Sequence, residues 1–275
     1  MGIGYKREAN LSSTQGQRFS DRLTYARLWI AQQRGRELPK TELAEVLGVT
    51  SPSYQRYEDG TVVPHPWPGT AVQVAAYDHC IAAHRDEARW IAFIDIDEFL
   101  FSPTGEPLTK ILPRYESAPG IGVNWVNFGT SGHQRRPAGL VIDNYVHQIR
   151  NPSARRVIKS IVNPAETLHA GSCHHFIYRD GFAVDDCIRP IRGPDFTRTD
   201  PVPRRWLRIN HYVSRSEEDL EQKRAMPRAD TGAARTGSGA PAYGDVQDET
   251  IRVFAPAVRE AVAAAQERIE RRRAS

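Results

Sequence analysis

The stretch that most restricts the fold is an apolar run that ends abruptly in acidic residues. The run WIAFI (90–94) is apolar throughout and is followed by DIDEF, which contains Asp95, Asp97 and Glu98. Apolar side chains at successive positions indicate a strand that is buried on both faces. A helix is predicted over residues 72–88, where apolar residues recur at helical spacing. A helix followed by such a strand predicts an α/β sheet.

Further strands, a loop and a C-terminal helix are predicted in the rest of the chain. Further strands are predicted over residues 121–128, 140–149 and 155–162. Residues 228–245 are rich in Gly, Ala, Ser and Pro and are expected to form a flexible loop. The chain is then predicted to end in a helix over about residues 247–273. The basic residues at its end are favourable there, because the C-terminal end of a helix dipole is negative.

Composition describes an ordinary globular chain. Hydrophobic residues make up 40% and charged residues 25% of the 275 residues, which is enough for a core, and the net charge of +4 is too small to indicate a polyanion partner. No apolar window reaches the length of a membrane span, and the N-terminus lacks the apolar core of a signal peptide. The three cysteines form no Cys-x-x-Cys pair. We therefore expect a cytoplasmic protein.

The N-terminal part differs in character from the rest. After a flexible terminus over residues 1–17, three short helices are predicted within residues 18–64. Prolines at positions 64, 66 and 68 then interrupt any helix, so residues 65–275 are expected to form a second domain.

The three short helices carry helix-turn-helix spacing. Ala44 lets two helices cross closely, and Gly48 supplies the positive φ of a tight turn four residues later. This all-α segment resembles the Cro and phage-repressor type of helix-turn-helix domain. The resemblance implies contacts to duplex DNA from a recognition helix that carries Ser51, Ser53, Gln55 and Arg56. A packing unit without DNA contact is the other interpretation, because acidic residues balance the nearby basic ones.

The acidic turn after residue 94 suggests a metal site. In open α/β sheets, ligands bind beyond the carboxyl ends of the strands. Asp95 and Asp97 occupy alternate positions, and on an extended chain they would point the same way. Carboxylate oxygens suit Mn²⁺ or Mg²⁺, either of which could bridge a diphosphate. In isolation, however, an Asp-x-Asp pair more often serves as a loop or capping feature.

The surrounding sequence carries a second resemblance. WIAFIDIDEFLF, with the helix before it, resembles the metal-binding centre of glycosyltransferases with the GT-A fold, in particular family 92 and its family 2-like relatives. The likeness continues in the same order through VNWVNFGTSGH, GLVIDNY, KSIVNP, LHAGSCHHF, LRINHYVSRSEEDLEQKRAMPRAD and DETIRVFAPAVRE.

This resemblance implies a GT-A-like, Rossmann-like mixed sheet with flanking helices. It also implies a metal-dependent glycosyltransferase that moves a sugar from a nucleotide-sugar donor to a carbohydrate or other hydroxyl acceptor. The implied metal or diphosphate ligands are Asp95, Asp97 and His211. The implied phosphate partners are Lys159 and Lys223, and the implied acceptor side includes Trp125 and Ser131.

An inverting transfer also requires a carboxylate that deprotonates the acceptor hydroxyl. Asp185, Asp186 and Glu98 are the available candidates, and Asp186 is chosen, although a solvated loop acid explains it equally well. The segment that holds the nucleotide base in the family is replaced here by the helix-turn-helix, which implies an impaired donor pocket. The alternative function is a helix-turn-helix DNA-binding protein fused to a non-catalytic transferase remnant, or a fusion without a selected function.

Overall fold

The computed structural model describes residues 65, 67, 69, 71–150, 156–193, 195, 202–235 and 243–274. Two compact units divide the chain: residues 68–266 form one, and residues 1–67 with 267–275 form the other. The predicted helix-turn-helix lies outside the described residues. The fold below is that of residues 68–266.

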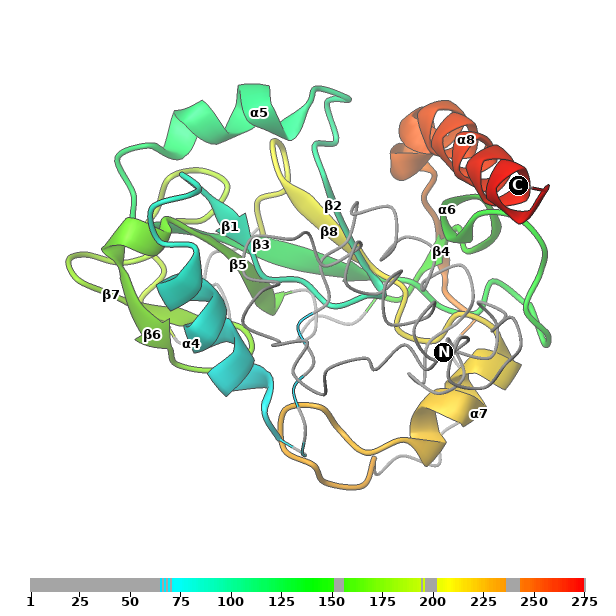
Figure 1. Cartoon of the computed structure of the whole chain (residues 1–275), viewed down its shortest axis with the longest axis horizontal. Helices are drawn as coiled ribbons and strands as arrows, with labels where there is room; N and C mark the ends of the chain where they lie inside the picture. Colours follow the sequence, from blue (N-terminus) through cyan, green and yellow to red (C-terminus); the bar gives the residue numbers. More distant parts are fainter. Residues whose placement is uncertain are drawn as a thin grey trace, which may run out of the picture. The chain divides into compact units, whose positions relative to one another are not determined.

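A mixed sheet of five strands forms the centre of this unit (Figure 1). The middle pair, β3 and β8, is parallel, and the other neighbouring strands are antiparallel. In spatial order the strands are β1 (Ile91–Ala92), β5 (Ile158–Val162), β3 (Gly120–Asn127), β8 (Arg208–His211) and β2 (Glu98–Phe101). Two small antiparallel sheets pair β4 (His147–Gln148) with β9 (Val246–Gln247) and β6 (Thr167–Ala170) with β7 (Phe176–Tyr178).

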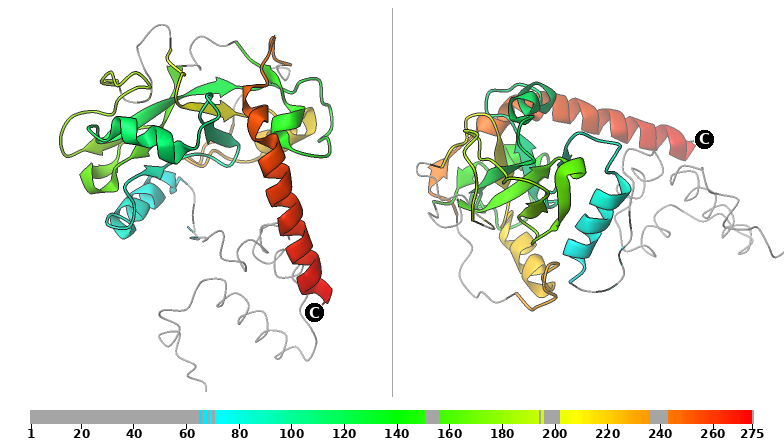
Figure 2. Two further views of the ribbon diagram at one scale, coloured as in Figure 1. Left: turned by 90° about the horizontal axis from the view of Figure 1, so that it is seen from above. Right: turned by 90° about the vertical axis from the view of Figure 1, so that its left-hand side faces the viewer.

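Helices flank the sheet, and α4 and α5 lie on different sides of it in the views of Figure 1 and Figure 2. The α-helices are α4 (Gln73–Ala83), α5 (Leu108–Ile111), α6 (Val141–Asn144), α7 (Glu217–Ala225) and α8 (Ala255–Ala274). The 3₁₀ turns are η2 (Leu112–Tyr115), η4 (Pro164–Glu166) and η5 (Thr250–Phe254). No helix among the described residues is long and apolar enough to cross a bilayer.

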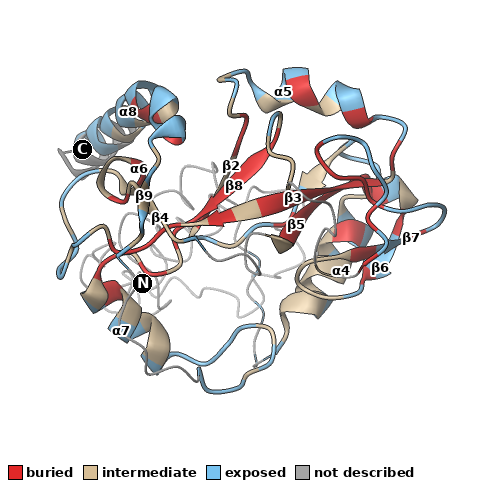
Figure 3. Cartoon of the chain, turned by 180° about the vertical axis from the view of Figure 1, so that it is seen from behind, coloured by how far each residue is buried: buried red, intermediate tan, exposed pale blue. Residues whose placement is uncertain are grey.

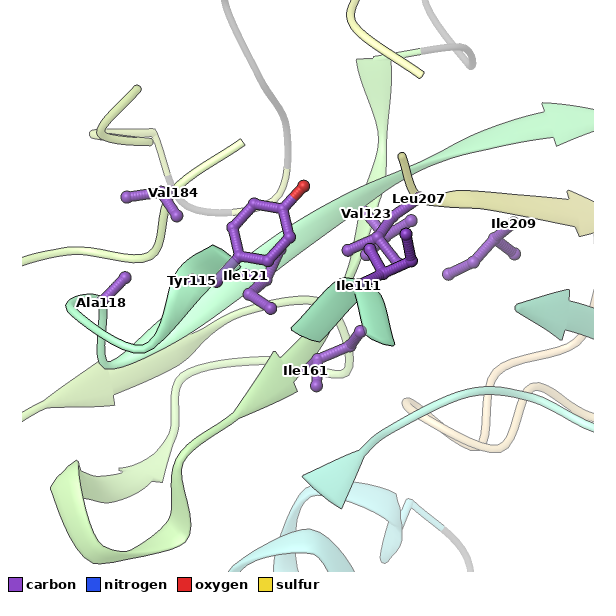
Figure 4. Close-up of a cluster of buried hydrophobic side chains, with 9 residues drawn as sticks. All are labelled: Ile111, Tyr115, Ala118, Ile121, Val123, Ile161, Val184, Leu207 and Ile209. Carbon is purple, nitrogen blue, oxygen red and sulfur yellow. The ribbon is translucent and has the colours of Figure 1, made fainter. Parts of the chain in front are cut away.

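Hydrophobic clusters hold these helices against the two faces of the sheet. Figure 4 shows one cluster, in which Ile111 and Tyr115 of α5 and η2 lie beside Ile161 of β5. On β5 the next residue, Val162, belongs to a different cluster with Ile81 of α4. Because consecutive strand residues point to opposite faces, the two clusters lie on opposite faces. The central strands are accordingly the most buried part of the sheet (Figure 3).

Two sequence-based predictions were wrong at the margins of the sheet. Residues 140–149 form α6 and the two-residue strand β4 instead of one strand. Asn144 closes the helical turn, because its amide donates to the carbonyls of Ala138 and Leu140, each at 2.9 Å. The C-terminal helix begins at Ala255 rather than near residue 247, because residues 246–247 pair with β4.

The strand before the acidic turn also differs from its prediction. β1 is an edge strand of two residues that pairs with β5, and Ala92 and Ile94 are exposed. The apolar run 90–94 is therefore half-buried at the rim of the sheet. The apolar composition of the run predicted burial on both faces, but it does not reveal whether a strand has a neighbour on each side, and β1 has only β5 in the described sheet.

Gly120 of β3 lies against the Tyr178 ring of β7. A Cβ atom at this position would lie 2.5 Å from Cζ and 2.9 Å from Cε1 of the buried Tyr178 ring. We expect Gly120→Val to lower the free energy of unfolding by about 1–3 kcal/mol, the usual cost of overpacking a core. Urea denaturation would measure it, with Ala92→Val on the exposed edge as the control. Equal stability of the two variants would contradict the prediction.

Candidate functional site

The acidic residues lie in a tight turn between β1 and β2. The amide of Glu98 donates to the carbonyl of Asp95, and the amide of Asp95 donates to Oε2 of Glu98, both at 3.0 Å. Ile96, at the tip of the turn, is fully exposed. The two aspartates therefore flank a turn, and the extended arrangement expected from their alternation is not present.

Asp95 is held by side chains from two other elements. Its Oδ1 accepts hydrogen bonds from Lys159 Nζ of β5 at 2.9 Å and from Gln73 Nε2 of α4 at 3.1 Å. The Lys159 side chain is 1% exposed and also donates to the carbonyl of Cys173 at 3.2 Å. Burial opposes the charge on Lys159, but the carboxylates of Glu98 and Asp95 outweigh it and raise its pKa.

Asp97 lies deeper and carries two contacts, one on each oxygen. Lys223 Nζ of α7 donates to Oδ2 at 2.6 Å, and Nε2 of His211 lies 3.7 Å from Oδ1. Burial tends to raise the pKa of Asp97, but His211 and Lys223 together outweigh burial and hold it well below its ordinary value. Asp97 is therefore an anion between two nitrogen groups.

Strand pairing fixes the orientation of His211. In the sheet register His211 lies opposite Asn127 of β3 and Glu98 of β2, so the three side chains share one face. Nδ1 of His211 lies 3.1 Å from Oδ1 of Asn127. An amide oxygen only accepts, so this partner assigns the proton to Nδ1. In the neutral ring, Nε2 then presents a lone pair towards Asp97.

Glu98 is a buried acid next to this group. It is 4% exposed, and its Oε1 has no hydrogen-bond partner among the described residues. Burial raises its pKa to about 7, against the opposing effect of Lys159. Glu98 therefore holds a proton more readily than an exposed glutamate does.

Helix α7 positions Lys223. Its start has a capping box, in which the Ser216 side chain accepts from the Asp219 amide and the Asp219 side chain accepts from the Ser216 amide. Arg136 donates to the same carboxylate of Asp219. The amide of Glu217 also donates to the carbonyl of His133 at 3.0 Å. These bonds anchor the N-terminal turn of α7, and Lys223 projects from its last turn.

The aromatic residue predicted for the acceptor side adjoins the same group. The Trp125 ring lies 4.4 Å from the imidazole of His211 and 5.3 Å from that of His174, measured between centroids. Ser131 is used differently, since its Oγ accepts from the amide of His147 and its own amide donates to the carbonyl of Tyr243. Ser131 therefore supports β4, and its hydrogen bonds do not involve the acidic turn.

Asp186 has a structural role, which does not support its prediction as the catalytic base. Its carboxylate accepts from the backbone amides of Arg205, Trp206 and Leu207 at 2.7, 2.9 and 2.7 Å. Tyr115 donates to the same residue at its carbonyl. A carboxylate that satisfies three amides ahead of β8 is poorly suited to accept a proton from a substrate.

Sequence reasoning missed Gln73 and Asn127, which hold Asp95 and His211. The helix and strand patterns place both residues, but only tertiary contacts show their partners. Among the described residues, no three side chains of His, Cys, Asp or Glu are grouped to hold an ion. The predicted DNA contacts Ser51, Ser53, Gln55 and Arg56 lie outside the described residues.

Comparisons with known proteins agree on one family. The model of glycosyltransferase family 92 matches residues 53–197, a range that includes Ser53, Gln55 and Arg56 and ends before His211 and Lys223. A family 92 protein of Ricinus communis is 34% identical over 166 residues, which cover 58% of this chain and 27% of that protein. A family 92 protein of Oryza sativa subsp. japonica is 34% identical over 121 residues, which cover 42% of this chain and 20% of that protein. One of Arabidopsis thaliana is 30% identical over 138 residues, which cover 45% of this chain and 23% of that protein. The chain thus spans less than a third of the length of these relatives.

Proposed function

Since this chain belongs to glycosyltransferase family 92, we propose that it transfers a sugar from a nucleotide-sugar donor to a hydroxyl acceptor at the acidic turn. The observation that carries the proposal is the arrangement around Asp97. One of its oxygens faces His211 Nε2 across 3.7 Å, and the other accepts from Lys223 at 2.6 Å. The Lys223 ammonium beside this carboxylate suits the departure of a diphosphate, which gains negative charge as it leaves.

We propose that Asp97 and His211 hold Mn²⁺ or Mg²⁺. The lone pair of His211 Nε2 and the Asp97 Oδ1 oxygen repel each other unless a proton or a metal ion lies between them. A carboxylate oxygen and an imidazole nitrogen suit Mn²⁺, and an ion with few protein ligands takes the others from phosphate and water. When bound, the ion neutralises charge on the diphosphate.

The remaining side chains orient the donor and the acceptor in this proposal. Lys159, buried and bonded to Asp95, keeps that carboxylate fixed. Lys223, whose side chain is 24% exposed, is the lysine available to the diphosphate. Trp125 provides an apolar face for the acceptor sugar beside His211. The mixed sheet, with the acidic turn at the end of β1, supports a GT-A-like fold.

Glu98 is our candidate for the general base. Of the two acids, it is the one next to Asp97, and its Oε1 has no hydrogen-bond partner among the described residues, whereas both oxygens of Asp186 accept backbone amides. A pKa of about 7 lets a carboxylate accept a proton at neutral pH and still act as a base of useful strength.

The direct experiment measures release of nucleoside diphosphate from UDP-, GDP- and TDP-sugars, with Mn²⁺ or Mg²⁺ and a set of sugar acceptors. Release from at least one donor, dependent on the metal, is expected. Millimolar donor concentrations also detect a weakly bound donor. No release from any donor, together with no heat of binding by calorimetry, would contradict the proposed activity.

His211→Gln tests the metal ligand separately. The amide replaces a strong nitrogen ligand with a weak one, so Mn²⁺ affinity should fall by about 10- to 100-fold, the effect usual for damage to a metal site. Electron paramagnetic resonance of free Mn²⁺ measures this affinity. His169→Gln, on the exposed face of β6, is the matched control. Equal affinities for the two variants would exclude His211 as a ligand.

A further inference from the structure

The two carboxylate oxygens of Asp97 differ in their contacts. Oδ2 accepts a hydrogen bond from a lysine, whereas Oδ1 lies near His211 but beyond hydrogen-bond distance from it. Lys223 Nζ is 2.6 Å from Oδ2, whereas His211 Nε2 is 3.7 Å from Oδ1, which exceeds a hydrogen bond. The two groups come from α7 and β8 respectively. A metal ion bound between Oδ1 and His211 would therefore share the Asp97 carboxylate with Lys223.

The two lysines of the site are not equivalent. Lys159 is 1% exposed and lies between Asp95 and the carbonyl of Cys173, so its ammonium is enclosed. Lys223 is 24% exposed and has two hydrogen bonds in the described part of the chain, to Asp97 and to the carbonyl of Val213. An ammonium has three N–H donors, so Lys223 has a donor to spare.

Lys223 is also placed so that it can move. It lies in the last turn of α7, whose capping box is at the other end; at this end the amide of Met226 donates to the backbone carbonyl of Lys223, a bond that does not involve the lysine side chain. Met226, directly after the helix, is 63% exposed. A lysine has four rotatable carbons between backbone and charge, so its ammonium can leave Asp97 without disturbing the helix.

Movement of the Lys223 ammonium away from Asp97 is favourable when a diphosphate arrives together with the metal ion. Lys223 neutralises Asp97, and a divalent ion that binds alone at Oδ1 adds charge beside an existing ammonium, which repels it. A diphosphate that arrives with the ion brings negative oxygens that can accept from Lys223. The lysine then loses one anionic partner and gains another.

We propose that Lys223 exchanges partners during loading of the site, from the Asp97 carboxylate to an oxygen of the metal-bound diphosphate. The inference rests on the proposed metal site at Asp97 and His211. Lys223 then weakens binding of the metal ion alone, because both need the Asp97 carboxylate. It strengthens binding of the metal ion together with diphosphate, because it donates to a phosphate oxygen. Metal and diphosphate therefore bind cooperatively, and by linkage each favours the other equally.

Lys223→Met tests the exchange because two affinities should change in opposite directions. Removal of the ammonium should tighten binding of Mn²⁺ alone by about five- to tenfold, within the range usual for coupled ligands. It should weaken binding of the preformed complex of Mn²⁺ with inorganic pyrophosphate by a similar factor. Electron paramagnetic resonance measures the first affinity and isothermal titration calorimetry the second, and neither requires turnover.

Two further variants complete the design. Lys110→Met, on the exposed face of α5, removes one positive charge elsewhere and should change neither affinity. Lys223→Arg keeps the charge and should resemble the unaltered protein, and circular dichroism checks that each variant is folded. If Lys223→Met changes both affinities in the same direction, or changes neither, the exchange is wrong. If the unaltered protein binds neither probe, the metal site fails and the exchange fails with it.

Discussion

Asp97→Asn is expected to remove sugar transfer almost completely, with a loss of at least about 100-fold in kcat/KM. The amide keeps the shape of the side chain but carries no charge, so it binds a divalent ion poorly and leaves Lys223 without its anionic partner at 2.6 Å. The partly buried position of Asp97 strengthens both effects, because water screens a partly buried pair less than an exposed one. Release of nucleoside diphosphate from the best donor measures the loss.

Asp180→Asn is the matched control, since Asp180 is an exposed residue in the turn after β7. It should retain the activity of the unaltered protein. Urea denaturation should show both variants folded at the assay temperature. Asp97→Asn that is folded and retains more than a tenth of the activity would be incompatible with a central role for this carboxylate.

Asp186→Ala is expected to destabilise the protein by about 2–3 kcal/mol. The substitution leaves the buried amide of Leu207 without its acceptor, which costs about 1–3 kcal/mol, and the partly buried amides of Arg205 and Trp206 add less because water reaches them. These amides precede β8, the strand that carries His211. The free energy of unfolding in urea measures the loss.

The informative comparison is activity per folded molecule. Below the unfolding transition, Asp186→Ala should retain a kcat within a fewfold of the unaltered protein, because the carboxylate takes no part in the reaction. Asp180→Ala provides the reference for a surface aspartate. A variant of unchanged stability and abolished kcat would restore Asp186 as the general base and remove Glu98 from that role.

Local patterns predicted the elements that are defined by their own residues. Residues 121–128 were expected as a strand and form β3, and the helix expected from residue 72 is α4, although it ends at Ala83. Residues 140–149 were assigned wrongly because Asn144 bonds to carbonyls before it, an interaction that the apolar alternation does not reveal. Edge and central strands are likewise indistinguishable in composition, which is why the exposure of β1 was missed.

The sequence pointed to several residues of the candidate site but not to their pairing. Asp95, Asp97, Lys159 and Lys223 each lie in a recognisable segment, yet Lys159 is 64 positions from Asp95 and Lys223 is 126 positions from Asp97. Which lysine meets which carboxylate depends on how β5 and α7 are placed by the sheet. The same applies to Asp186, whose role follows from three amides about 20 residues further along the chain.

The insertion of β8 between β2 and β3 constrains the order in which the sheet can assemble. β2 has β8 as its neighbour in the sheet, and β8 is made more than a hundred residues after β2. On the ribosome, the acidic turn therefore emerges long before β8 and before Lys223, which neutralises Asp97. Contacts of such long range slow folding, because the intervening chain must close first. A nascent chain that stops before residue 208 presents two open strand edges, and we expect it to aggregate.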